Sequence, residues 1–192
     1  MKKKILLIRC AFAVILLTGC GSRIEVYESV SDYSRYMSFG VTDENSAWYK
    51  WGVDESIWPE SIKDEKAVSE YRMVRYDPWD AQYLGYLVVK YRPDEYAKET
   101  ERLQNYESTE YIGYYCVEEE HTYELLAVFA DPYQGFVYAL TDGESRIIYA
   151  EQIFCNYLMD LDYKEYIPEE YLLDGFNATK DSPYYREMTK GL

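Results

Sequence analysis

Short apolar segments separated by strong turn signals fill the middle of this chain, and they constrain its fold more than any other feature. The segments with an extended pattern are 68–76, 82–91, 111–117, 123–130, 136–141 and 146–155. The breaks between them are rich in Asp, Pro and Gly, which turns select for their backbone angles. A hairpin followed by a four-stranded antiparallel meander accounts for this series.

Two of the breaks predict particular turns. In the first, Asp77 precedes Pro78, a pair that fits the first two positions of a type I turn. In the second, Asp142-Gly143 lies between two apolar segments, which predicts a hairpin with a type I′ turn. The segment 82–91 is apolar on both faces, as expected of a central strand that is covered on both sides.

One long helix is predicted after the first hairpin, from Pro93 to about Tyr106. Proline suits the first helical turn, and the acidic residues beside it favour the positive end of a helix. The apolar stripe is narrow, so the helix should pack on a sheet. The expected fold class is therefore α+β, with an antiparallel-rich sheet of about six strands and one main helix packed on a face. Shorter helical segments are expected at 29–37 and 168–173.

The first twenty residues have the pattern of an export signal. Three lysines at 2–4 precede a mainly apolar stretch that ends in Leu-Thr-Gly-Cys at 17–20. This ending resembles the lipobox of bacterial lipoproteins, and the chain as a whole resembles small surface lipoproteins of Gram-positive bacteria. The resemblance implies a lipid anchor on Cys20 at the extracytoplasmic face of the cell membrane. It divides the chain into a signal peptide (1–19), a short tether (20–28) and a single α+β domain (29–192).

Composition excludes several classes of protein. The formal net charge of −15 predicts no nucleic-acid partner, because phosphate backbones would repel the domain. The hydrophobic fraction of 48% excludes a disordered tail, and after the signal no apolar run is long enough to span a bilayer. The ten glycines form no phosphate-binding loop pattern, and we expect no cofactor.

The cysteines and the single histidine leave alternatives open. Cys116 and Cys155 both fall in predicted strands, where they are either two buried thiols, the favoured interpretation, or a disulfide that the compartment would permit. His121 follows three glutamates and could belong to a cation site. Its spacing matches no metal motif, so a solvated loop is favoured and no metal is expected.

Catalytic side chains are few. A lone histidine weakens any nucleophile–histidine proposal. Paired carboxylates remain possible, because 35 acidic residues always offer pairs. A small carboxylate-dependent hydrolase that acts on cell-surface polymers is therefore the alternative function.

Aromatic residues are abundant, with 24 Tyr, 4 Trp and 6 Phe. Tyrosine suits half-buried strands, but rings on a surface also bind sugars and peptides. Residues 48–58 contain Trp48, Tyr49, Trp51 and Trp58 in a segment with weak secondary-structure signal, so these rings are candidates for a surface or for a lid over the sheet.

The predicted topology brings two turns together and defines a candidate binding rim. The helix is expected to return the chain to the end of the sheet at which the turn 77–80 lies. The strand 111–117 would then run away from that end and the strand 123–130 back to it, so the turn 131–135 would lie beside the first turn. The rim residues are Trp79, Tyr133, Asp77, Asp80, Asp131 and Gln134. The favoured function is a non-catalytic binding or accessory module for a glycan, a peptide or a protein partner.

Overall fold

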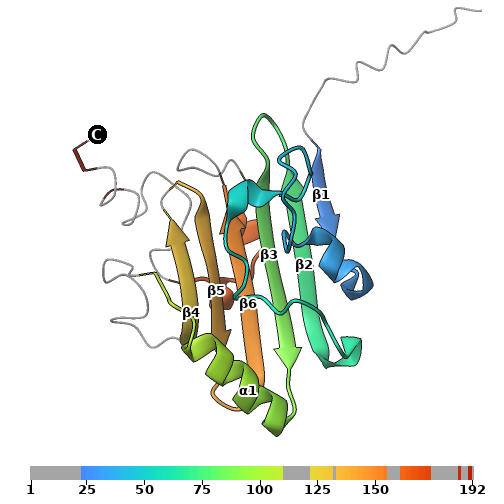
Figure 1. The fold of residues 1–192 in the computed structure, drawn as a ribbon, viewed down its shortest axis with the longest axis vertical. Helices are drawn as coiled ribbons and strands as arrows, with labels where there is room; N and C mark the ends of the chain where they lie inside the picture. Colours follow the sequence, from blue (N-terminus) through green and yellow to red (C-terminus); the bar gives the residue numbers. More distant parts are fainter. Residues whose placement is uncertain are drawn as a thin grey trace, which may run out of the picture.

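Six strands form one antiparallel sheet in the computed structural model, which describes residues 23–109, 122–131, 133–154 and 161–173, with 186, 190 and 191 (Figure 1). The spatial order is β1-β2-β3-β6-β5-β4. The strands are β1 (Ile24–Tyr27), β2 (Val68–Tyr76), β3 (Gln82–Lys90), β4 (Glu124–Asp131), β5 (Gly135–Thr141) and β6 (Arg146–Ile153). The predicted α+β class is confirmed.

The first hairpin, β2 and β3, has the predicted bounds within a residue, and Val74 pairs with Leu84 near its centre. Strand β6 lies between β3 and β5, so the chain returns to the middle of the sheet at the last strand of the described residues. Residues 24–27, which the sequence places in the tether, instead form the edge strand β1 against β2. The predicted strand at 111–117 lies outside the described residues.

The turn between β5 and β6 is where it was predicted, but its type differs. Asp142 does not have the positive φ that a type I′ turn requires, whereas Gly143 has φ 76°. The carboxylate Oδ1 of Asp142 instead accepts the backbone N–H groups of Glu144, Ser145 and Arg146 at 2.9 Å each. This side chain satisfies three donors at once, which favours the longer loop over a two-residue turn.

Helix α1 (Pro93–Gln104) begins at the predicted proline and has Asp94 and Glu95 in its first turn. It lies beside the end of the sheet where β3 ends, and it runs across towards β4 (Figure 1). It therefore does not return the chain to the opposite end, as the sequence predicted. After the helix, the backbone N–H of Thr109 donates to the carbonyl of Val128 in β4.

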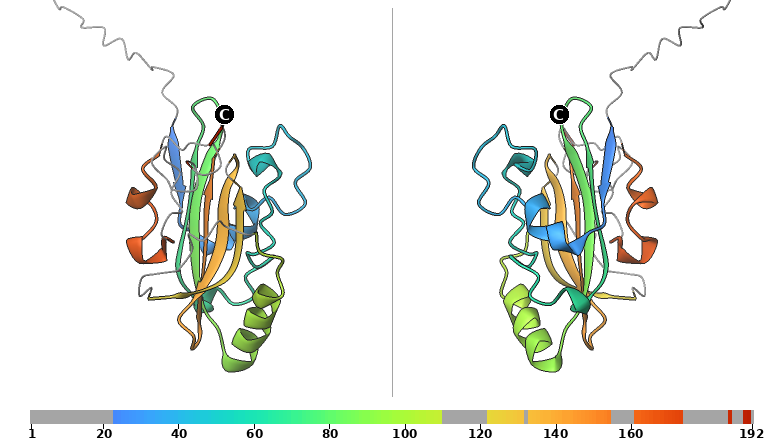
Figure 2. Two further views of the ribbon diagram at one scale, coloured as in Figure 1. Left: turned by 90° about the vertical axis from the view of Figure 1, so that its left-hand side faces the viewer. Right: turned by 90° about the vertical axis from the view of Figure 1, so that its right-hand side faces the viewer.

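Both faces of the sheet are covered (Figure 2). One face packs against the segment 161–173, which contains the short 3₁₀ helices η4 (Tyr163–Glu165) and η5 (Glu169–Tyr171). The other face packs against α1, the 3₁₀ helix η1 (Val30–Tyr36) and the irregular segment 48–62. Strands β3, β5 and β6 are consequently buried on both sides.

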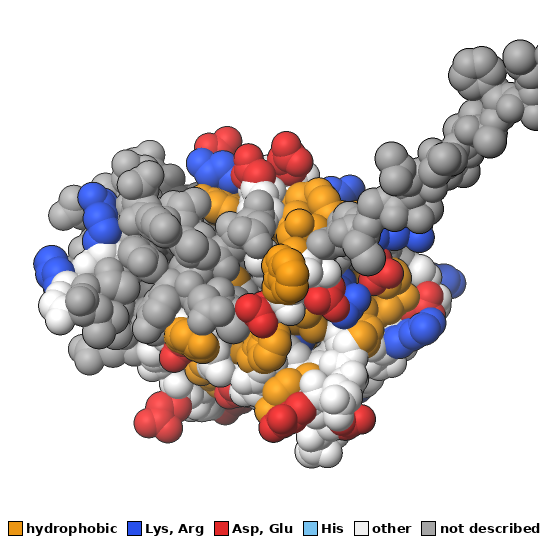
Figure 3. All heavy atoms as spheres, turned by 90° about the horizontal axis from the view of Figure 1, so that it is seen from above, with side chains coloured by type: hydrophobic (Ala, Val, Ile, Leu, Met, Phe, Trp, Pro, Cys, Tyr) orange, Lys and Arg blue, Asp and Glu red, His pale blue; other side chains and the backbone are white. Residues whose placement is uncertain are grey.

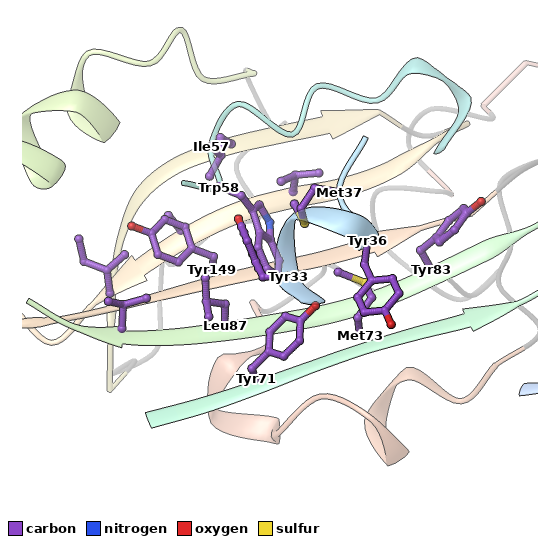
Figure 4. Packing of buried hydrophobic residues seen from close by; sticks show 14 of the residues in the cluster. Tyr33, Tyr36, Met37, Ile57, Trp58, Tyr71, Met73, Tyr83, Leu87 and Tyr149 are labelled. Atoms are coloured by element: carbon purple, nitrogen blue, oxygen red, sulfur yellow. The ribbon is translucent and has the colours of Figure 1, made fainter. Parts of the chain in front are cut away.

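Aromatic side chains dominate the second of these faces. Tyr33 and Tyr36 of η1 lie over strand residues that include Tyr71 and Tyr149 (Figure 4). The hydroxyl of Tyr33 donates to the carbonyl of Pro59, which ties η1 to the irregular segment. Most tyrosines of this face are therefore structural, as the composition favoured. Within the described residues, no helix is long and apolar enough to cross a bilayer.

Candidate functional site

The two predicted turns lie at the same end of the sheet. Because every neighbouring pair is antiparallel, β2 and β4 run in the same direction and finish at the same end of the sheet. The register agrees, since Tyr83 in β3 and Gly135 in β5 both pair with Ile153 in β6. This topological prediction is confirmed, although α1 does not provide the expected route.

Three rings are exposed at this end. Figure 3 shows the molecule from above, with hydrophobic and acidic side chains interspersed. Trp79 is 93% exposed, Tyr133 is 44% exposed and Trp51 is 36% exposed. We call these three residues the aromatic end. A tryptophan exposed almost completely contributes little to the folded core, and three exposed rings at one end of the sheet make a candidate contact surface.

Trp51 connects the two turns. Its indole Nε1 donates to the carbonyl of Ala81 at 3.0 Å, beside the first turn. Its own carbonyl accepts a hydrogen bond from Nε2 of Gln134 at 2.9 Å, in the second turn. The three exposed rings therefore stand on backbone segments that hold one another in place.

The predicted acidic rim residues have mainly structural contacts. Oδ1 of Asp131 accepts the backbone N–H groups of Tyr133 and Gln134 at 2.8 Å each, which shapes the second turn. Asp77 pairs with the guanidinium of Arg75. Asp80 is half-buried in the first turn. Trp79 is thus more exposed than any of these carboxylates, whereas Asp77 is exposed to about the same extent as Tyr133.

The other aromatic candidates of the irregular segment separate into two groups. Trp58 is 1% exposed and packs against Tyr33 and Tyr149, so the prediction that it lies on a surface is wrong. Trp48 is half-buried and stacks among Tyr36 and Tyr83. Tyr49 is also half-buried. These residues form the lid that the sequence left as an alternative.

Beneath the aromatic end, three ionisable side chains meet in the core. Lys50 Nζ contacts the carboxylate of Glu55 and lies 2.8 Å from Oε1 of Glu151 in β6. All three side chains have no exposed surface. We call Lys50, Glu55 and Glu151 the buried cluster.

Aromatic rings and one glycine enclose the buried cluster. The Lys50 ammonium lies 5.8 Å from the ring centroid of Trp48 and 5.5 Å from that of Tyr83, close enough for cation–π attraction. Gly85 pairs with Glu151 across β3 and β6. A Cβ at position 85 would lie 3.3 Å from Cγ of Glu151 and 2.9 Å from Cε of Met73, so glycine leaves room for these two side chains.

The two glutamates have opposite electrostatic environments. Burial alone would raise the pKa of Glu55, but Lys50, Glu151 and Ser38 together hold that pKa below its usual value. Ser38 donates to the Glu55 carboxylate from both its backbone N–H and its hydroxyl. Burial dominates at Glu151 and raises the pKa of that carboxyl well above its usual value, although Lys50 opposes the shift.

The pKa of Lys50 is shifted as well. Burial alone would lower it, but the two carboxyl groups hold it above its usual value. The three directions together favour an ammonium on Lys50, a carboxylate on Glu55 and a protonated Glu151. Oε2 of Glu151 is buried and has no donor among the described residues, which agrees with a carboxyl group that carries its own proton.

An unusual backbone turn joins the aromatic end to the buried cluster. Lys50 has φ 45°, Trp51 has φ 58° and Gly52 has φ 74°, three successive residues in the left-handed region. Non-glycine residues there cost about 1–2 kcal/mol each, so the ion pair and the Trp51 hydrogen bonds must compensate. The turn directs Lys50 into the core and places Trp51 on the surface.

Sequence reasoning missed the buried cluster, although one signal pointed to it. Glu151 lies in a strand that is otherwise largely apolar, and a carboxyl group in such a strand requires a partner. Lys50 gave no signal, because its neighbours in the sequence have no clear pattern. Its inward direction depends on the left-handed turn.

Several predicted residues cannot be placed, because Cys20, Cys116, Cys155 and His121 fall in parts of the chain that the structure does not describe. The lipid anchor, the thiols or disulfide, and the histidine loop therefore stay predictions. In the described ranges no group of three or more His, Cys, Asp and Glu side chains has the arrangement of a metal site.

Comparison with family models, with curated proteins and with solved structures finds no match to this chain.

Proposed function

We propose that the protein is a lipid-anchored, non-catalytic binding module whose contact surface is the aromatic end. The observation that carries this proposal is the exposure of Trp79, together with two further exposed rings at the same end of the sheet. The hydrogen bonds of Trp51 hold the surface ready before any ligand arrives. Such preorganisation lowers the entropic cost of binding.

A carbohydrate is the ligand class that this surface supports best. Flat indole and phenol rings stack on the apolar faces of sugars, and the neighbouring Asp80 and Gln134 have polar side chains at the same edge. The strongly acidic domain, by contrast, repels anionic polymers. A neutral or amino sugar therefore suits the aromatic end better than a phosphate-rich polymer.

The hydrolase alternative has weaker support. Glu55 and Glu151 are a carboxyl pair with displaced pKa values, as such an enzyme needs. However, both side chains are fully buried, and an oligosaccharide would have to reach them through the packed rings of Trp48 and Tyr83. A binding surface needs no such opening.

Ile24, four residues after the proposed anchor, lies at the same end of the sheet as the aromatic end. The chain enters β1 at Ile24, which pairs with Tyr76 at the start of the first turn. Four residue steps separate Cys20 from Ile24, a reach of at most about 14 Å. An anchor at Cys20 would hold the aromatic end close to the membrane.

Replacing Cys20 with alanine tests the anchor. We expect Cys20→Ala to lose the acyl chains and either to stay uncleaved or to leave the detergent phase in phase partition, while its circular dichroism spectrum stays that of the parent chain. Cys10→Ala is the matched control, because it removes a cysteine of the predicted signal and should leave partition unchanged. Equal detergent partition of the parent chain and a Cys20→Ala chain that has lost residues 1–19 would contradict the anchor.

Replacing the exposed rings tests the contact surface. On an oligosaccharide array, the detergent-solubilised full chain should bind at least one sugar, and Trp79→Ala/Tyr133→Ala should weaken that binding by roughly tenfold or more, since each aromatic contact contributes about 0.5–1.5 kcal/mol. The unfolding midpoint should not change, because these rings contribute little to the core.

The matched control for this experiment is Trp79→Phe/Tyr133→Phe, which keeps two flat rings and should retain most of the affinity. Unchanged affinity in the alanine pair would remove the aromatic end as the contact surface. The chain could instead bind no sugar but bind sugar-free phosphatidylcholine vesicles in a way that depends on the rings. This result would show that the surface contacts lipid and would refute the proposal of a carbohydrate ligand.

A further inference from the structure

The buried cluster contains the groups of an amide-forming reaction. Lys50 supplies an amine, Glu151 a carboxyl group and Glu55 a second carboxyl group, all without contact with water. Nothing in the proposed function uses them. Burying a lysine and two glutamates in a core carries a desolvation cost, because buried ion pairs seldom stabilise a fold better than apolar residues.

We propose that Lys50 and Glu151 form an intramolecular amide bond that links the irregular segment covalently to β6. The Nζ of Lys50 lies 2.8 Å from Oε1 of Glu151, so the carboxyl carbon is one bond further away. Reacting groups held at such separations behave as though their effective concentration were on the order of 10⁵ M or more. The left-handed turn holds Lys50 in position, and Glu151 is held in β6, which lies in the middle of the sheet.

Glu151 is the carboxyl group that reacts, and Glu55 is the base. The Glu55 carboxylate accepts hydrogen bonds from Lys50 and twice from Ser38, which favours its ionised form. Oε2 of Glu151 has no donor among the described residues and lies in the core, which favours the protonated, electrophilic form. The two glutamates thus divide the roles of proton acceptor and acyl group.

The reaction balances in protons and charge. Glu55 takes one proton from the Lys50 ammonium, and the free amine attacks the carboxyl carbon of Glu151. The C–N bond forms and the C–O bond of the Glu151 hydroxyl breaks. Of the three protons on Nζ, one stays on the amide nitrogen, one ends on Glu55 and one leaves with the hydroxyl as water. No oxidant or other reactant is needed.

The dry surroundings favour the product. Before the reaction the core holds an ammonium and a carboxylate, and afterwards it holds an amide and a neutral acid. Removing two charges from a medium of low polarity relieves the desolvation cost of the ion pair. In water the same condensation is disfavoured, since both reactants are ionised and solvated. The rings of Trp48 and Tyr83 beside Lys50 therefore have a chemical role as well as a packing role.

Peptide mapping of the full-length chain tests the bond. A reacted Lys50 is not cleaved by trypsin, so the digest should contain residues 36–63 joined to residues 147–164, with a mass lower than the sum of the two peptides by one water. Fragmentation should locate the link between Lys50 and Glu151. Separate recovery of 36–50, 51–63 and 147–164 from the folded parent chain would refute the proposal, and a link between Lys50 and Glu55 would refute the assignment of Glu151.

Two variants serve as controls. Glu55→Gln keeps a hydrogen-bonding side chain beside Lys50 but cannot accept its proton, so it should yield the uncoupled peptides from a folded chain. Lys50→Arg keeps the cation and the tryptic site but has no reactive amine, and it should also yield the uncoupled peptides. A linked product at full yield in Glu55→Gln would refute the role of Glu55. Because these outcomes are read by mass, they are independent of any ligand of the aromatic end.

Discussion

Gly135→Ala should lower the free energy of unfolding by about 3 kcal/mol or more, combining left-handed backbone strain with a steric clash. Gly135 has φ 123°, and a Cβ built there would lie 2.1 Å from the carbonyl oxygen of Gln152. The neighbouring atoms are backbone of β6, which cannot move without breaking the β5–β6 ladder. Chemical denaturation monitored by tryptophan fluorescence measures the change.

Gly143→Ala is the matched control for this prediction. Gly143 also has a positive φ, 76°, but no heavy atom lies within 4 Å of its built Cβ. Its alanine variant should therefore lose only the backbone term, about 1–2 kcal/mol. Equal losses in the two variants would show that the β5–β6 contact at Gly135 is not the cause. Because Gly135 directly follows Gln134, its variant should also weaken the hydrogen bond to Trp51.

Relative to the chain before the proposed amide forms, Lys50→Met should lower the free energy of unfolding by about 3–5 kcal/mol, the cost of leaving a buried carboxylate without its cation. Glu55 would keep its two donors from Ser38 but lose its only ammonium partner among the described residues. The apolar methionine fits among the surrounding rings, so loss of packing is a small part of the change. Equilibrium unfolding at pH 7 gives the value.

The double variant Lys50→Met/Glu55→Gln isolates the effect of charge. Neither variant can form the proposed amide, so the difference between them reports the carboxylate alone. We expect the double variant to be more stable than Lys50→Met by about 1–3 kcal/mol, as for a buried polar group that regains a neutral form. A double variant no more stable than the single one would mean that Lys50 acts through packing.

The sequence predicts the strands and α1 well because local patterns determine them. Turn residues at 77–80 and at Asp142 end strands, and Pro93 begins the helix. The sheet order was not predictable in the same way. The position of β6 between β3 and β5 depends on pairing between distant segments, and several apolar strands are equally suited to that place.

The candidate site divides in the same manner. Trp79 and Tyr133 could be placed at one end from strand lengths and directions, and the structure agrees. Trp51 could be singled out as aromatic but not assigned to that end, because its position results from a left-handed turn at non-glycine residues. Trp58 was left open between a surface and a lid and proves to be part of the lid, since an irregular segment gives no periodicity that distinguishes the two.

The entry of the chain at the aromatic end has a consequence for affinity. With the proposed anchor at Cys20, the domain and any ligand carried by the same membrane are confined to one thin layer. Confinement of this kind raises the effective concentration of the ligand to about the millimolar range for short tethers. A contact surface that bound such a ligand weakly in free solution would then be occupied for more of the time. A soluble ligand would gain none of this advantage, so with the proposed anchor the position of Ile24 beside Tyr76 would favour ligands that are themselves tethered.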